Sequence, residues 1–391
     1  MNILFLMKLY DVGGIEVVAA TLASCFVSHG HHVVIMSFNT PNELTIARTD
    51  KRVQIFTLDG YEVTKKNVAT LRNILIEHQI QVVVNQWGLP LVPCRVLDKA
   101  KEGLNIKTIA VYHNQIDTNA RIKDVEIALE KCRNPIKGCI LYIKKAIFKF
   151  VTSRSMAYVY RHTDVYQVLS QSYVPLFSKF TGINHPDHLM VQTNPVTIDS
   201  SDFIYSFQSK QKEIIYMGRI DYNQKRVYRV IDTWAKLEAQ FPDWKLTVVG
   251  DGIERRSVEK QVAEYSLQNV TFEGFQQPKL YYERASILLL TSEYEGFPLV
   301  LAECMSFGVI PVVYDSYSAV RDIISDGKDG IVIPYCKDGY RAEVAASMLA
   351  DIMMSDEKRK VMAIAAIEKS KCYSLDRIYE QWMKTFEILV S

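Results

Sequence analysis

The sequence predicts an α/β protein with two doubly wound parallel sheets, one in each half of the chain. Short runs rich in β-branched residues alternate with longer helix-like segments, and these runs are apolar almost throughout. The pattern occurs twice within 391 residues, a length that suits two domains of ordinary size. Because strands that are apolar on both faces are typical of parallel sheets covered by helices, each half is expected to form a Rossmann-like domain.

The first half, which we assign to one domain spanning residues 1–195, contains six runs that we predict to be strands. They are NILFL (2–6), HVVIMS (32–37), QVVVN (81–85), IKTIAVYH (106–113), VYQVLS (165–170) and LMVQTN (189–194). Gly13 and Gly14 follow the first run and open an apolar helical segment. Glycines at this position either let a ligand approach the backbone closely or simply form a tight turn.

A polar stretch at residues 196–212 has no strong pattern and is predicted to be the linker between the domains. The second domain is assigned to residues 213–372, and it repeats the alternation of strands and helices. Its predicted strands are EIIYMG (213–218), KLTVVG (245–250), NVTFEG (269–274), SILLLTS (286–292), VIPVVYD (309–315) and GIVIP (330–334).

The tail, residues 373–391, contains an amphipathic helix. Ile378, Trp382, Phe386 and Leu389 recur at helical spacing, and no strand follows them. We therefore expect this helix to pack across the junction between the domains.

The charge of the chain is small overall and unevenly divided. A formal net charge of +2 argues against a general nucleic-acid-binding protein. Residues 1–200 have 22 Lys and Arg against 16 Asp and Glu, a net charge of +6, whereas the remainder has 24 against 28, a net charge of −4. The first half is basic and the second is acidic.

The cysteines and the apolar runs indicate a cytoplasmic protein. Seven cysteines are an odd number, and they lack CxxC pairs and metal-ligand spacing, as expected of reduced thiols. The N-terminal stretch MNILFLMKLYDVGG has no basic leader or cleavage site and is predicted to be a first strand. No apolar run reaches the roughly 18–20 residues that cross a bilayer. We expect a soluble or peripherally attached protein.

The segment EGFPLVLAE, residues 295–303, has a carboxylate at each end of an apolar stretch. It follows a predicted strand, and Pro298 has the fixed φ that suits the first position of a helix ending near Ser306. Ligands of doubly wound sheets bind at this edge. The free amides of Leu299 and Val300 would therefore form a phosphate site at the positive end of the helix.

The two carboxylates of this segment indicate a ligand that carries hydroxyl groups. Glu295 and Glu303 would repel a phosphate unless each accepted hydrogen bonds from a polyol. A sugar beside Glu295 and a ribose beside Glu303 meet this requirement. The alternative is a charged loop followed by an exposed helix glutamate.

A second segment with suitable chemistry is MGRIDYNQKRV, which also follows a predicted strand. Gly218 allows a sharp turn, and Arg219 and Lys225 can converge on a diphosphate, the arginine as a fork and the lysine as a point charge. Arg226 and Arg229 are adjacent competitors for this role. The alternative interpretation is a solvated basic loop.

His113 stands at the carboxyl end of the predicted strand 106–113. A lone histidine is more often structural than catalytic. Its place at the ligand-binding edge of the first sheet makes a role in the site equally reasonable.

Several of these motifs, taken together, resemble one family. The chain is similar to the retaining nucleotide-sugar glycosyltransferases of the GT-B fold, the group 1 and family 4 type. The resemblance is strongest over residues 213–334 and implies two Rossmann-like domains that face each other across a cleft holding the site. The motifs are VGGIE, MGRIDYNQKRV, VVGDG, FEG, SEYEGFPLVLAECMSFGVIPVV and DGKDGIVIP.

The resemblance implies roles for individual side chains. Glu303 would hold the donor ribose, Glu295 would face the donor sugar, and His113 would lie near the primary hydroxyl of that sugar. Arg219 and Lys225 match the diphosphate clamp of the family. The remaining binding residues would contribute mainly backbone contacts. These are Gly13, Gly14, Gly218, Gly274, Gly296, Phe297, Leu299 and Val300.

The resemblance also implies the chemistry. The donor would be a UDP- or GDP-sugar, and the acceptor a glycan or a polyprenyl-linked sugar in bacterial polysaccharide or lipopolysaccharide assembly. No DxD-type cluster ends a strand, so Arg219 and Lys225 would replace a metal, and no cofactor is expected. Retention would proceed by same-face internal return, with double displacement through Glu295 as the alternative. Arg226 stands where the family commonly has glycine.

Two other functions fit the same residues. A GT-B sugar-nucleotide epimerase would consume donor without an acceptor. A noncatalytic subunit would bind the nucleotide sugar without turnover, although Glu295, Glu303, Arg219 and Lys225 are all present.

One further segment, residues 131–154, has seven Lys and Arg and no Asp or Glu. Aliphatic and aromatic residues interleave with the basic ones, as in an interfacial helix at an anionic membrane surface. We therefore expect peripheral attachment to the inner face of a membrane. The alternative is a helix packed on the first domain with a solvated basic face.

Overall fold

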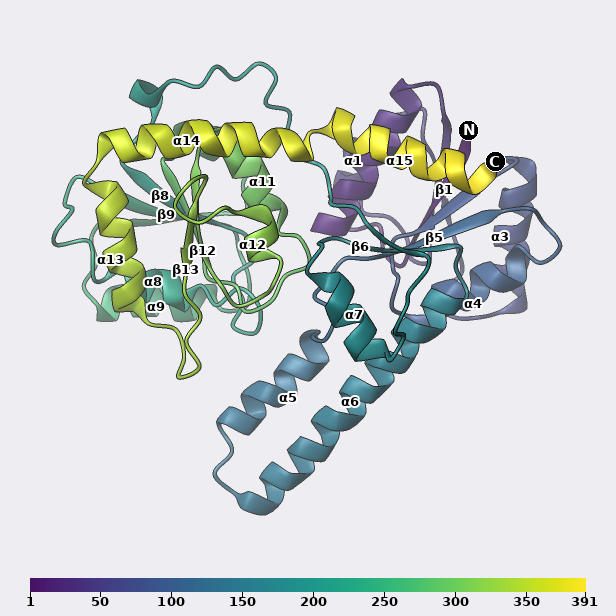
Figure 1. Cartoon of the computed structure of the whole chain (residues 1–391), viewed down its shortest axis with the longest axis horizontal. Coiled ribbons are helices and arrows are strands. Elements are labelled where there is room, and N and C mark those ends of the chain that lie inside the picture. The colour runs from purple at the N-terminus through teal and green to yellow at the C-terminus, as the bar shows by residue number, and fades with distance from the viewer. The chain divides into compact units, whose positions relative to one another are not determined.

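The computed structural model describes all of residues 1–391 and divides them into two compact units. The first unit consists of residues 1–197 and 375–391, and the second of residues 198–374. Each unit has its own parallel sheet with helices packed around it (Figure 1). The prediction of two doubly wound α/β domains is confirmed.

The sheet of the first unit has seven parallel strands in the order β3-β2-β1-β4-β5-β6-β7. Its central strands are the apolar runs of the sequence, and residues 3–7 of β1 are fully buried. The order reverses beside β1, which creates the switch point where such sheets bind ligands. The bounds are β1 Asn2–Met7, β2 His32–Ser37, β3 Gln54–Thr57, β4 Val82–Asn85, β5 Lys107–Tyr112, β6 Val165–Val168 and β7 Leu189–Val191.

Eight helices belong to this unit. Asn42, Thr64, Asn119 and Asn134 each begin a helix by accepting a hydrogen bond from a first-turn amide. The bounds are α1 Gly14–Ser28, α2 Glu43–Arg48, α3 Lys65–Glu77, α4 Leu91–Ala100, α5 Ala120–Glu130, α6 Pro135–Arg161, α7 Tyr173–Thr181 and α15 Leu375–Val390.

The last helix, α15, packs on the first unit although it ends the chain. Trp382 and Phe386 are buried, and their rings lie 6.4 and 5.6 Å from the ring of Phe26 in α1. The hydroxyl of Tyr379 lies 3.0 Å from Nε2 of His31. Aromatic packing therefore fixes this helix to α1.

The sheet of the second unit has six strands in the order β10-β9-β8-β11-β12-β13, again all parallel. The strands are β8 Glu213–Met217, β9 Lys245–Val249, β10 Val270–Gly274, β11 Ile287–Leu290, β12 Ile310–Tyr314 and β13 Ile331–Ile333. The helices are α8 Tyr228–Trp234, α9 Arg255–Glu264, α10 Lys279–Arg284, α11 Leu299–Ser306, α12 Val320–Ile323, α13 Ala342–Met353 and α14 Asp356–Ser370.

The stretch 196–212, predicted as a linker, is tied to the second unit from Ile198 onward. It contains a short 3-10 helix, Phe207–Ser209. The ammonium of Lys210 donates a 2.6 Å hydrogen bond to the carbonyl of Tyr282. Burial of this side chain lowers the pKa of Lys210 to about 7.

Candidate active site

The loop after β8 begins with a close approach between two backbones. Gly218 has a φ of +144° and Gly250, directly after β9, a φ of +138°. A Cβ added to Gly250 would lie 1.9 Å from the carbonyl oxygen of Gly218, so no side chain fits there. The glycines of the MGR and VVG motifs therefore bring the ends of β8 and β9 together at the carboxyl edge of the sheet.

Asp221 holds the shape of the β8–α8 loop. One carboxylate oxygen accepts hydrogen bonds from the amides of Gln224, at 2.7 Å, and Lys225, at 3.2 Å. The other accepts from Nε of Arg219 at 2.8 Å. The arginine side chain is still 65% exposed, which leaves its outer nitrogens accessible to a ligand.

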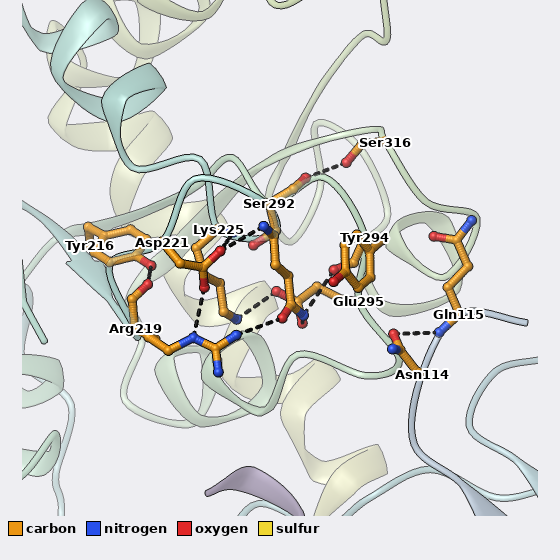
Figure 2. A network of polar contacts seen from close by, with 11 residues as sticks. Asn114, Gln115, Tyr216, Arg219, Asp221, Lys225, Ser292, Tyr294, Glu295 and Ser316 are labelled. Carbon is orange, nitrogen blue, oxygen red and sulfur yellow. Dashed lines mark hydrogen bonds and ion pairs between the residues drawn. The ribbon is translucent and has the colours of Figure 1, made fainter. Parts of the chain in front are cut away.

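Lys225 reaches from this loop to Glu295 in the loop after β11. The Nζ of Lys225 lies 2.6 Å from Oε1 of Glu295, and the two side chains are 16% and 8% exposed. Gln224 donates to Oε2 of Glu295 at 3.1 Å and accepts from Arg219 at 3.1 Å. Figure 2 shows the resulting chain of contacts. Three residues predicted to act on the donor, Arg219, Lys225 and Glu295, are therefore brought into one network.

Arg226 and Arg229, the competing arginines, are buried and have structural partners. The guanidinium of Arg229 lies 2.8 Å from the carboxylate of Glu293 and donates to the carbonyl of Thr291 at 3.2 Å. The hydroxyl of Thr291 donates in turn to the carbonyl of Arg226 at 3.1 Å. These two arginines hold the loop against β11 rather than extending into solvent.

The segment that was predicted to form a helix after β11 does so as α11. Pro298 was predicted to be the first helical residue and is instead the N-cap, so the helix begins one residue later. Leu299 and Val300 are its first two residues. Their amides belong to the first turn, where the helix supplies no partner. Gly308, with a φ of +69°, ends the helix. This positive helix end follows Glu295 closely in the sequence and lies at the same edge of the sheet as the Lys225–Glu295 pair.

Glu303 is only 5% exposed, so the alternative of an exposed helix glutamate is wrong. The hydroxyl of Tyr282, in α10, donates to Oε2 of Glu303 at 3.3 Å. Burial raises the pKa of Tyr282 well above its usual value, and the negative charge of Glu303 raises it further. The phenol therefore stays protonated and can donate this hydrogen bond. Tyr282 thereby fixes the direction of the carboxylate.

The other predicted binding residues of this unit lie in the same loops. Gly296 and Phe297 are buried between Glu295 and α11, and the ring of Phe297 packs edge-on against Tyr373 at 5.2 Å. Gly274 ends β10 with a φ of +69°, and its carbonyl accepts from the amide of Gly250 at 2.7 Å.

The predicted residues of the first unit lie at the carboxyl edge of its own sheet. Gly13 is the N-cap of α1 and Gly14 its first residue. A Cβ on Gly13 would lie 2.4 Å from Oε2 of Glu16, so glycine makes room for this carboxyl group. Burial raises the pKa of Glu16 to about 7, with the charge of Asp11 adding to the effect.

His113 directly follows β5. Its Nε2 lies 2.5 Å from Oε1 of Gln86, which directly follows β4. Burial lowers the pKa of His113 to about 3, so the ring is neutral at physiological pH and donates to Gln86 from Nε2. This arrangement leaves Nδ1 as a hydrogen-bond acceptor.

Comparison with known proteins identifies the family. The model of the glycosyl transferases group 1 matches residues 197–369, and that of glycosyltransferase family 4 matches residues 12–199. Together the two models account for nearly the whole chain. The chain belongs to the GT-B glycosyltransferases.

Individual relatives are similar in sequence over nearly the full length of this glycosyltransferase. An amylovoran biosynthesis glycosyltransferase of Erwinia amylovora is 24% identical, with 95% of each chain covered. An α-1,4-N-acetyl-D-galactosaminyltransferase of Campylobacter jejuni, whose name specifies an undecaprenol-linked substrate, is 25% identical, with 98% of each covered. Among solved structures, HepE of Anabaena in complex with UDP and glucose shares the fold at a TM-score of 0.74, with 16% identity and 99% of each chain covered.

Sequence reasoning missed four residues that organise the sites of this glycosyltransferase: Glu16, Asp221, Gln224 and Tyr282. Glu16 lies within the quoted VGGIE motif, and Asp221 and Gln224 lie within MGRIDYNQKRV. Their residue types could have drawn attention there. Nothing in the sequence points to Tyr282, because its partner lies 21 positions later.

The enzyme has no group of three or more His, Cys, Asp or Glu side chains arranged to hold a metal ion. None of its helices is both long and apolar enough to span a membrane.

Proposed function

We propose that this glycosyltransferase moves a sugar from a UDP- or GDP-sugar to a glycan or polyprenyl-linked acceptor during assembly of bacterial surface polysaccharide or lipopolysaccharide. The names of the relatives support this setting. The observation that supports it most within the structure is the Arg219–Gln224–Lys225–Glu295 network at the carboxyl edge of the second sheet, beside the first turn of α11.

The donor diphosphate would bind to Arg219, Lys225 and the amides of Leu299 and Val300. Negative charge grows on the diphosphate as the glycosidic bond breaks. Fixed cations and helix amides therefore stabilise the transition state more than the ground state. Because Asp221 and Gln224 already hold the loop, the enzyme needs little rearrangement when that charge develops.

Glu303 would accept hydrogen bonds from the two ribose hydroxyls. The hydroxyl of Tyr282 donates to Oε2 of this carboxylate and helps to orient it. An ionised carboxylate has room for further donors, and a vicinal diol supplies two of them.

The contacts of Glu295 favour retention by same-face internal return. Both of its oxygens accept hydrogen bonds, Oε1 from Lys225 and Oε2 from Gln224. A carboxylate that is paired and bonded in this way is a weak nucleophile, which disfavours a glycosyl-enzyme intermediate. Glu295 would instead hold Lys225 in place and accept a hydroxyl of the donor sugar, with His113 serving the primary hydroxyl.

The enzyme would work in the cytoplasm, attached peripherally to the inner face of the membrane. A polyprenyl-linked acceptor is embedded in a bilayer, and residues 131–154 have seven basic side chains and no acidic ones. Attraction to an anionic leaflet is worth about 1 kcal/mol for each basic residue near the surface.

A transfer assay tests the proposal. Purified enzyme would be incubated with a panel of UDP- and GDP-sugars and short-chain polyprenyl diphosphate sugars, and the products identified by mass spectrometry. We expect one donor to give an extended acceptor and free nucleoside diphosphate, with at least about a hundredfold loss in Lys225→Met. Lys212→Met, at an exposed lysine paired with Asp243, is the control. Donor turnover without acceptor would instead indicate an epimerase, and binding without turnover a noncatalytic subunit.

A further inference from the structure

Helix α6 has an apolar stripe that no part of the first unit covers. Four isoleucines alternate at spacings of four, three and four residues, and a phenylalanine and a valine continue the row, so all share one side of the helix. Each side chain is more than half exposed. Single exposed apolar residues are common on protein surfaces, but a continuous row of six is not. The residues are Ile136, Ile140, Ile143, Ile147, Phe150 and Val151.

The opposite side of α6 is covered by α5. Figure 1 shows the two helices side by side as a hairpin that extends away from the sheet of the first unit. The Nζ of Lys145 lies 2.9 Å from the carboxylate of Glu126 in α5. Thr152, two turns further along, accepts a 3.1 Å hydrogen bond from the side chain of Asn119 at the start of α5. The apolar stripe therefore faces away from α5.

Basic residues border this stripe. Lys137 and Lys144 are exposed and lie about a quarter-turn from the stripe, and Arg154 extends the row of Phe150 at the end nearer the sheet. No acidic residue occurs between positions 131 and 154. A second copy of the chain would bring two such basic borders together, whereas an anionic surface would neutralise them.

We propose that α6 lies in the interface of an anionic lipid bilayer, with its isoleucine stripe inserted at the boundary between headgroups and acyl chains. Lys137 and Lys144 would extend from the border of the stripe to the phosphates of the lipid headgroups. This inference rests on the proposed membrane-embedded acceptor and deepens it, because it replaces a purely electrostatic contact by an insertion.

The structure also shows which lysines of α6 can reach a bilayer on the side of the stripe. Lys145 is held by Glu126 on the α5 side, so it is not available to a bilayer on the stripe side. Lys137 and Lys144 are the residues that combine exposure with a place beside the stripe.

Flotation with vesicles tests the insertion. The full chain would be mixed with vesicles of phosphatidylcholine with or without about one-third phosphatidylglycerol. We expect binding to the anionic vesicles, at least about a tenfold loss in the triple variant Ile140→Ser/Ile143→Ser/Ile147→Ser, and no loss in the matched control Ile204→Ser/Ile253→Ser. The control isoleucines are 88% and 91% exposed and belong to the second unit. Unchanged binding of the triple variant would overturn the proposal.

A probe of depth gives a second readout. Cys139 lies beside the stripe and is the exposed cysteine of the chain, so an environment-sensitive fluorophore attached there reports on insertion. Its emission should shift to the blue with anionic vesicles and stay unchanged with the triple variant. An unshifted emission from vesicle-bound protein would contradict insertion. Light scattering tests the alternative that the stripe forms a dimer interface. If the wild type were a dimer, the triple variant a monomer, and neither bound vesicles, the stripe would be assigned to self-association and the insertion would be overturned.

The outcome is separable from that of the proposed function. Transfer to a short-chain acceptor in detergent-free buffer does not require a bilayer, so the triple variant should retain it. If the wild-type enzyme bound and inserted but transferred no sugar, the insertion would stand and the proposed function would fail.

Discussion

The ammonium of Lys225 lies 2.6 Å from a carboxylate oxygen of Glu295, although the two residues are 70 positions apart. The pair joins the loops after β8 and β11 at the carboxyl edge of the second sheet. Each side chain is at least four-fifths buried, so its charge depends on the other. A residue assigned to the diphosphate and a residue assigned to the sugar are thus one electrostatic unit.

Removing one member of this pair should cost stability as well as activity. We expect Lys225→Met to lower the free energy of unfolding by roughly 3 kcal/mol, because Glu295 would remain as an uncompensated, largely buried charge. The double variant Lys225→Met/Glu295→Gln should recover most of that loss in chemical denaturation while remaining inactive. Equal stability of the single and double variants would show that the pair is not coupled.

The proposed leaving-group stabilisation predicts independence from divalent metals. Activity should survive EDTA, and Arg219→Ala should lower kcat about a hundredfold or more without unfolding the protein. Arg321→Ala is a matched control, because Arg321 is similarly exposed and also paired with an aspartate, Asp315, in the same unit. Loss of activity on chelation, restored by Mg²⁺ or Mn²⁺, would contradict this prediction.

Glu303 and Tyr282 should differ in the size of their effects on nucleotide binding. Glu303→Gln should weaken binding of the nucleoside diphosphate by about 1.5–3 kcal/mol, as expected for charge-assisted hydrogen bonds to ribose. Tyr282→Phe removes one hydrogen bond to this carboxylate and should cost about 1 kcal/mol. Calorimetry with the ribo and 2′-deoxy forms of the nucleotide separates the roles: an undiminished preference for ribose in Glu303→Gln would remove Glu303 from the ribose site.

The raised pKa of Glu16 predicts a pH-dependent stability. Its folded pKa of about 7 exceeds the usual value of 4.5, so between these pH values the folded state binds more protons than the unfolded one. Stability from this group is present below pH 4.5 and is lost as pH rises through 7. Glu16→Gln should therefore match the wild type at pH 4 and exceed it at pH 8, by at most about 3 kcal/mol. The melting temperatures of the two proteins, measured from pH 4 to pH 8, check this. A difference between them that stays constant with pH would contradict the prediction.

The sequence predicted the central strands because their apolarity is local information. The strand β3 was missed, because it lies at an edge of the sheet and none of its four residues is fully buried. The start of α11 was predictable from Pro298 and the apolar run after it. The contacts between loops were not, since Gln224 and Glu295 meet only through the fold.

Arg226 shows how a departure from the family pattern acquires a physical meaning. The family commonly has glycine at this position, and Arg226 has a φ of +53°, in the left-handed region that glycine occupies without strain. The guanidinium lies 4.5 Å from the ring centroid of Tyr222, a contact that glycine would lack. The turn is therefore kept, and the side chain offsets part of the backbone strain.

The central claim is that Arg219 and Lys225 bind the diphosphate of a nucleotide donor at the edge of the second sheet. The most direct test is calorimetric titration, in metal-free buffer, of UDP, GDP and the corresponding monophosphates into the wild type, Arg219→Ala/Lys225→Met and the control Arg321→Ala/Lys212→Met. We predict that the wild type and the control prefer one diphosphate over its monophosphate by at least about tenfold, and that this preference disappears in Arg219→Ala/Lys225→Met. An equal preference in all three proteins, or no binding of either diphosphate to the wild type, would contradict the claim.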